Sequence, residues 1–167
     1  DIFRYYQYVE CAYSSNDFAR WGSPLWVGLY NLIYRSNQVI NNIQDLDIEN
    51  KNKYSAEARF MRAYAYFWLV RSYGKLPIVT KQLNRDEAMK KPRDPVSEVY
   101  ALIEEDLSFA VNNLPEDSPK GRAHKYVAEA ILARVYIMQS GYPVNAEKYN
   151  EAIPLLEDII NSGKYEL

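Results

Sequence analysis

The chain has 167 residues, of which 48% are hydrophobic and 25% charged, the size and composition of one folded domain with a substantial core. The formal net charge is −2 and the basic residues are scattered, which argues against nucleic-acid binding. A single cysteine, Cys11, excludes an internal disulfide, and the single histidine, His124, has no neighbouring cysteine or histidine for a transition-metal site. We therefore expect neither a cofactor nor a metal.

The first part of the chain predicts two helices joined by a polar loop. Aromatic residues in 3–13 recur at roughly helical spacing and predict the end of a helix, whereas residues 14–22 predict a turn-rich loop. Ser23 precedes a proline, which is typical of a helix start, and apolar residues at helical spacing predict a helix over about 24–43. A charged turn is expected at 45–53.

The stretch Ser55–Gly74 predicts the central helix of the fold. It is rich in alanine, no proline or glycine interrupts it, and Gly74 stands where a helix most easily ends. Every residue from Ala63 to Val70 is apolar or aromatic, so this half of the helix should be buried on nearly all sides, between two layers of other elements. The run is too short for a membrane span, which needs about 20 apolar residues.

After this helix, residues 75–80 predict a short extended run and residues 81–93 a polar, charged loop. Asp94 again precedes a proline, as a cap before a helix, and a clean apolar stripe follows until Leu114.

The last part of the chain predicts two more helices, over about 122–139 and about 146–161. Pro154 falls inside the second of them and should kink it or delay its start.

The helices repeat in pairs. The second and fourth helices share residues at positions 72 apart: Tyr54, Ala56, Glu57, Ala58, Arg62 and Tyr64 match Tyr126, Ala128, Glu129, Ala130, Arg134 and Tyr136. The first and third helices share Tyr30, Leu32 and Ile33 with Tyr100, Leu102 and Ile103. We infer helix pairs at about 24–73 and 94–139, with a third pair begun at about 146. This predicts an all-α array of tetratricopeptide-like repeats, about five to six helices with long loops. The alternative is a plain helical bundle with chance similarity.

Glu57 and Arg62, which recur as Glu129 and Arg134, lie too far apart around a helix to pair with each other. We expect each to meet a partner from a neighbouring helix, in a structural role.

The loop 14–22 is the main candidate for ligand binding. Asn16, Asp17, Arg20 and Trp21 supply an aromatic face and the polar groups that sugar recognition requires, on a loop held by a helix. The alternative is an ordinary loop with Trp21 tucked into the core.

A second candidate is the long connection 75–94, which either meets a partner protein or is a solvated connector.

No catalytic set is evident: there is no Ser-His-Asp candidate, no glycine-rich phosphate loop and no HExxH. The carboxylates of 104–106 occupy successive helix positions and point in different directions. We therefore expect no enzyme.

Several segments, in order and in spacing, resemble the SusD/RagB family of Bacteroidetes outer-membrane nutrient-binding lipoproteins. The strongest is AEARFMRAYAYFWLVRSYGKLPIVT at 56–80. The others are LYNLIYRSNQVINNI at 29–43, RDPVSEVYALIEEDLSFAVNNLP at 93–115, GRAHKYVAEAILARVYIM at 121–138 and YNEAIPLLEDIINSGKYEL at 149–167.

The resemblance implies that residues 1–167 are one SusD-like helical-repeat domain from a longer protein, with the leader, the lipidated cysteine and the carboxy-terminal ligand-binding region outside this chain. It further implies a surface-exposed lipoprotein of the outer membrane that binds glycan or another nutrient, without catalysis, and delivers it to a SusC-like TonB-dependent transporter. The competing expectation is a helical-repeat scaffold for protein–protein contacts that has no small ligand.

Overall fold

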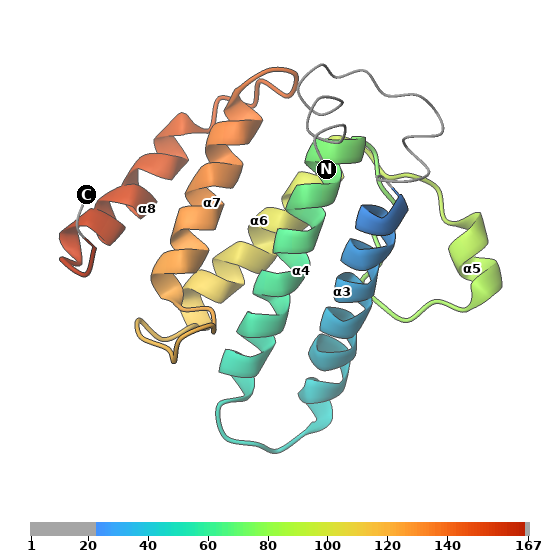
Figure 1. Ribbon diagram of the computed structural model, residues 1–167, viewed down its shortest axis with the longest axis horizontal. Helices are drawn as coiled ribbons and strands as arrows, with labels where there is room; N and C mark the ends of the chain where they lie inside the picture. The colour runs from blue at the N-terminus through green and yellow to red at the C-terminus, as the bar shows by residue number, and fades with distance from the viewer. Residues whose placement is uncertain (1–22, 166–167) are drawn as a thin grey trace, which may run out of the picture.

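The computed structural model describes residues 23–165, and within that range the chain is all helical, with no strand. In chain order the elements are α3 (Ser23–Asn42), the short 3-10 helix η2 (Ile43–Asp45), α4 (Lys51–Tyr73), α5 (Arg85–Lys90), α6 (Val96–Asn113), α7 (Lys125–Ser140) and α8 (Tyr149–Asn161). Each long helix packs on the next in the order α3, α4, α6, α7 and α8, while the short α5 stands apart beyond α3 (Figure 1). The expected all-α repeat fold is confirmed. No helix among the described residues is both long and apolar enough to cross a membrane.

Helix α4 is the centre of this array, packed against α3 on one side and α6 on the other. Ala63, Tyr66 and Leu69 are fully buried, which confirms the burial expected from the apolar run. Only a narrow strip of α4, including Met61 and Trp68, stays exposed. Gly74 ends the helix at φ 71°, with its N–H bonded to the carbonyl of Val70.

The internal repeat extends to burial: equivalent positions of the paired helices are buried in both copies. In α3 the buried residues Ile33, Ser36, Asn37 and Ile40 match the buried Ile103, Asp106, Leu107 and Ala110 of α6. In α4 and α7 the buried residues Ala56, Phe60, Ala63 and Phe67 match Ala128, Leu132, Val135 and Gln139. Equivalent helices therefore present equivalent faces to the core, which favours a repeat over a chance similarity.

A buried ion pair joins α3, α4 and α6. The guanidinium of Arg62 donates to both carboxylate oxygens of Asp106, at 2.7 and 2.8 Å, and to Oδ1 of Asn37 at 2.8 Å. Arg59 donates to Asp106 as well, at 3.1 Å. Burial raises the pKa of the Asp106 carboxyl above its ordinary value, although the hydrogen bonds from Arg62 act in the opposite direction.

The expectation that each repeated charge meets a neighbouring helix holds for Arg62 but not throughout. The expectation also holds for Glu129, which interacts with Asp158 of the neighbouring α8 in addition to its pair with Lys125 of its own helix. Glu57 pairs with Arg122, in the loop before α7. Arg134 is exposed and makes no ion pair with any described residue, so the prediction for it was wrong. The reason lies in α8, where Ile159 occupies the position that Asp106 occupies in α6.

Several expected boundaries near α4 also need correction. The turn expected at 45–53 is shorter, because α4 begins at Lys51 rather than Ser55. The loop expected at 81–93 contains α5, which a capping box starts: Asn84 accepts from the N–H of Glu87, and Glu87 accepts from the N–H of Asn84.

The remaining corrections concern helix starts. Asp94 does not cap α6: its carboxylate accepts the N–H of Ile78, and Pro95 holds the cap position. Helix α3 includes Ser23, and α7 begins at Lys125 rather than Arg122.

The start of α8 is delayed to Tyr149, and Pro154 lies inside the helix. Asn145 and Glu147 both have positive φ, at 51° and 54°, so the chain cannot be helical from Ala146.

Candidate functional site: an apolar groove between α3 and α4

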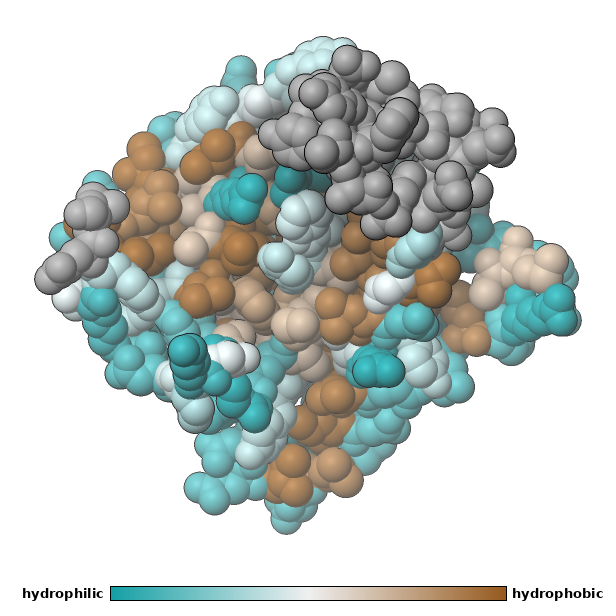
Figure 2. All heavy atoms as spheres, viewed as in Figure 1, coloured by the Kyte–Doolittle hydropathy of each residue, from teal (hydrophilic) through white to brown (hydrophobic). Residues whose placement is uncertain are grey.

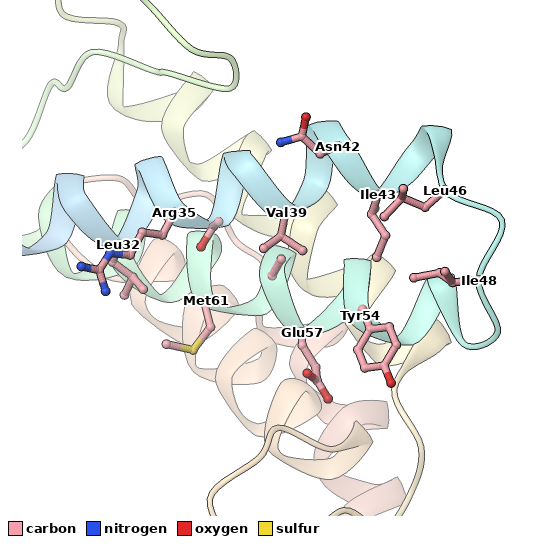
Figure 3. Close-up of a pocket in the computed structure, with 12 residues that line it drawn as sticks. Leu32, Arg35, Val39, Asn42, Ile43, Leu46, Ile48, Tyr54, Glu57 and Met61 are labelled. Carbon is pink, nitrogen blue, oxygen red and sulfur yellow. The ribbon is translucent and has the colours of Figure 1, made fainter.

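An open groove lies between α3, η2 and α4, beside the connection that joins α3 to α4 (Figure 3). Its volume is about 590 Å³. The lining side chains are Leu32, Arg35, Ser36, Val39, Asn42, Ile43, Leu46, Ile48, Tyr54, Glu57, Ala58 and Met61. We call this set the α3–α4 groove.

The sequence builds the α3–α4 groove by helical spacing. Leu32 and Val39 lie two turns apart on α3, and Tyr54 and Met61 lie two turns apart on α4, so each helix lends one face to the groove. Between them Ala58 has too little volume to fill the space. The groove therefore follows from small and large side chains alternating along two packed helices.

Large apolar side chains in this groove remain in contact with water. Val39 and Met61 are 43% and 40% exposed, and Leu46 and Ile48 are exposed as well. Apolar atoms gather over this end of α3 and α4 in the space-filling view (Figure 2). Because contiguous exposed apolar surface is unusual on a soluble protein, the α3–α4 groove is a candidate interaction site.

The chemistry of the groove favours apolar protein side chains over sugars. Among the described residues that line it, Tyr54 carries the only aromatic ring, and the carboxylate of Glu57 is already bonded to Arg122. A sugar site is typically built from aromatic platforms and several converging donors and acceptors, whereas most of these walls are aliphatic and the polar lining is Arg35, Ser36, Asn42 and Glu57. Among the described residues no three carboxylates, histidines or cysteines gather into a group that could hold a metal ion.

The connection 75–94, the second candidate of the sequence, starts from a rigid anchor. Side chains of α3 hold it: the Tyr30 hydroxyl donates to the Pro77 carbonyl at 2.8 Å, and Asn37 Nδ2 donates to the Val79 carbonyl at 2.8 Å. From α4, the Tyr66 hydroxyl accepts the N–H of Val79 at 2.7 Å. Beyond this anchor Met89 of α5 is 75% exposed. The structure therefore fixes where the connection leaves the array.

The tyrosines of this anchor are buried enough to change their acidity. Burial raises the pKa of Tyr66 to about 12, and burial also raises the pKa of Tyr30. Both hydroxyls therefore stay protonated through the physiological range and serve as hydrogen-bond partners.

The predicted ligand residues Asn16, Asp17, Arg20 and Trp21 lie outside the described residues. Reasoning from the sequence missed the α3–α4 groove. A signal was present in Leu46 and Ile48, two apolar residues within the stretch interpreted as a charged turn.

The fold defines a class, that of the helical-repeat proteins. The chain belongs to the SusD-like family, because the family described as "Starch-binding associating with outer membrane" matches residues 5–137.

Individual relatives agree with this assignment. A SusD-like protein of Bacteroides ovatus is 36% identical over 125 residues, which are 72% of this chain and 23% of that protein. The crystal structure of a SusD superfamily protein from Parabacteroides distasonis superposes with a TM-score of 0.79 at 32% identity, covering 86% of this chain and 32% of that chain. A crystal structure with xylogluco-oligosaccharide gives a TM-score of 0.76 at 32% identity, covering 87% of this chain and 30% of that one. The chain thus spans about a quarter of the length of the curated relatives it matches.

Proposed function

We propose that this chain is the helical scaffold of a protein that binds glycans at the outer-membrane surface and delivers them, without catalysis, to a SusC-like TonB-dependent transporter. The observation that carries the proposal is the match to the starch-binding family over residues 5–137. The similarity to a structure that contains xylogluco-oligosaccharide supports an oligosaccharide as the ligand.

Within this proposal the loop 14–22 and the α3–α4 groove have different tasks. The glycan is contacted by the loop 14–22, through Asn16, Asp17, Arg20 and Trp21, together with parts of the longer protein. The α3–α4 groove, which suits apolar protein side chains, receives the transporter. A lipid anchor outside this chain holds the protein at the membrane.

Two buried acidic residues, Asp106 and Glu129, serve the packing of the helices. Asp106 is fully buried and bonded to Arg62, so it cannot reach a substrate. Glu129 is buried against Lys125, with an ion pair of 3.5 Å. These carboxylates stabilise helix packing, and neither lines the α3–α4 groove.

Gel electrophoresis of the complete protein through immobilised xyloglucan or starch tests glycan binding. We expect retardation that Trp21→Ala abolishes. Trp68→Ala is the matched control, since Trp68 belongs to α4 and not to the loop, and its side chain is 37% exposed. Migration that no polysaccharide slows, or that both variants change alike, would contradict the role of the loop.

Co-purification with a SusC-like transporter tests the α3–α4 groove. Met61→Lys and Val39→Lys should reduce recovery of the transporter at least tenfold, because each places a charge in an apolar contact. Val127→Lys on α7, where the native residue is similarly exposed, should leave recovery unchanged. Equal recovery for all three variants would remove the groove from the interface.

The second candidate function, a protein–protein scaffold with no small ligand, is favoured by the apolar character of the groove. The two experiments separate the candidates: the scaffold function predicts loss of the partner in the groove variants and no retardation by any polysaccharide.

A further inference from the structure

A small polar pocket lies between α3 and the first part of the connection 75–94. Its volume is about 150 Å³. The lining side chains are five amides and one phenol: Tyr34, Asn37, Gln38, Asn41, Asn42 and Gln82. We call this set the amide pocket. Apart from Asn42 it shares no residue with the α3–α4 groove, so it is a separate feature of the surface.

Helical spacing places most of these residues in one row along α3. Tyr34, Asn37, Gln38 and Asn41 follow one another at spacings of three and four residues, so their side chains are neighbours on the helix surface. The exposed face of a helix usually carries charged as well as polar residues, yet this row contains neither an acid nor a base. Its composition therefore differs from that of an ordinary solvated face.

Hydrogen bonds fix the connection against this row. Asn37 Nδ2 donates to the Val79 carbonyl at 2.8 Å, and Asn41 Nδ2 donates to the Thr80 carbonyl at 3.3 Å. Asn37 is only 2% exposed, and its Oδ1 accepts from the buried guanidinium of Arg62 at 2.8 Å. Both walls of the amide pocket are therefore in position before any ligand arrives.

Several polar groups of the amide pocket have no hydrogen-bond partner among the described residues. These groups are the hydroxyl of Tyr34, Oδ1 of Asn41 and both ends of the Gln82 amide. Nε2 of Gln38 also has none, while Oε1 of the same residue accepts from Asn42 at 3.2 Å. Each amide offers a carbonyl acceptor beside an NH₂ group with two donors. The amide pocket therefore offers closely spaced donors and acceptors to a ligand.

This chemistry suits a neutral ligand with several hydroxyl groups. No charged side chain is among the described residues that line the amide pocket, so an anion or a metal ion would find no counter-charge. An apolar ligand would leave the amides without partners, which costs free energy.

A sugar ring has the required groups, because each hydroxyl both donates and accepts. Its C–H face can also stack on the ring of Tyr34, which is 48% exposed. The volume lies below the roughly 300–1,000 Å³ of pockets that hold drug-sized ligands, so there is room for one ring and not for a peptide segment.

We propose that the amide pocket is a subsite for one neutral sugar ring, in addition to the contacts proposed for the loop 14–22. This inference rests on the proposed function, because it adds a second place at which the same class of ligand is bound. Tyr34 is the stacking surface, and Asn41 and Gln82 bind the hydroxyls. Asn37 holds the connection in position.

Amide hydrogen exchange of the complete protein, followed by mass spectrometry, tests this proposal. The probes are the methyl glycosides of glucose, galactose and xylose, each too small to span two sites. A ring that bridges Tyr34 and Gln82 should slow the local opening of the connection. At twice its dissociation constant it should slow exchange at residues 78–80 about threefold, without changing exchange in α7.

Tyr34→Ala and Gln82→Ala should each abolish this protection. Neither side chain forms a hydrogen bond or ring contact with a described residue, so their removal should not disturb the fold. Tyr149→Ala and Gln44→Ala are the matched controls, since both residues are exposed and neither lines the amide pocket, and they should keep the protection.

The outcomes separate this proposal from the proposed function. If polysaccharide retards the parent protein but no methyl glycoside protects residues 78–80, the subsite alone is overturned. If neither effect occurs, both fail. Protection that survives in Tyr34→Ala and Gln82→Ala, or that extends equally to α7, would also overturn the subsite.

Discussion

Replacing Asp106 by asparagine tests the claim that a buried ion pair holds the first two helix pairs together. Asp106 is fully buried, and its carboxylate accepts two hydrogen bonds from Arg62 and one from Arg59. Asparagine keeps the shape but leaves the buried guanidinium of Arg62 without its counter-charge. Removing one partner of a buried pair typically costs about 3–5 kcal/mol, a large share of the roughly 5–15 kcal/mol that stabilises a domain. We expect Asp106→Asn to lower the free energy of unfolding by that amount.

Urea unfolding followed by circular dichroism measures this change. Glu105→Gln is the control, since the neighbouring Glu105 side chain is 69% exposed in its pair with Arg59 and should contribute no more than about 1 kcal/mol. The double variant Arg62→Met, Asp106→Leu should recover most of the lost stability, because it leaves no charge buried and unpaired. The reasoning would be refuted if the free energy of unfolding of Asp106→Asn lay within about 1 kcal/mol of that of the parent. It would also be refuted if the double variant were less stable than Asp106→Asn.

Three further predictions concern the anchor of the connection 75–94 and the end of α4. The pKa of Tyr66 is raised to about 12, above the value near 10 of an unfolded chain, so stability present below pH 10 should be lost as pH rises toward 12. Urea titrations at pH 9, 10 and 11 should show this loss of stability, and Tyr66→Phe should reduce it. If the free energy of unfolding fell equally with pH in the parent and in Tyr66→Phe, the raised pKa of Tyr66 would be contradicted. Gly74→Ala should lower the free energy of unfolding by about 1–2 kcal/mol, since φ at this position is 71°, and an unchanged urea midpoint would argue against strain there. Tyr30→Phe removes the bond to the Pro77 carbonyl and should speed amide exchange at residues 78–80 without changing exchange in α7, whereas uniform acceleration would indicate general destabilisation.

The sequence predicts the long helices well because their apolar spacing and their burial have the same cause. Helix α4 is the clearest case: its run of apolar residues corresponds to burial between α3 and α6. Helix α5 was missed because its six residues have no apolar face, although the capping box of Asn84 and Glu87 was present in the sequence.

The functional surfaces were harder to predict, because they depend on which residues from separate elements come together. The α3–α4 groove combines side chains of two helices with Leu46 and Ile48 of their connection, and no spacing within one segment indicates such a groove. In the same way Arg134 matches Arg62 in sequence but not in environment, because the partner that decides its role stands on a different helix. The predicted glycan contacts at Asn16, Asp17, Arg20 and Trp21 stay predictions.

The most direct test of the proposed function is calorimetric titration of the complete protein with oligosaccharides, followed by mass analysis of the sugar recovered from the same sample. Binding without catalysis predicts saturable heat release with at least one glycan class and a recovered oligosaccharide of unchanged length. Shortened products would contradict the account by showing an enzyme. An absence of heat across xyloglucan, starch and other oligosaccharides would contradict it by removing the glycan ligand.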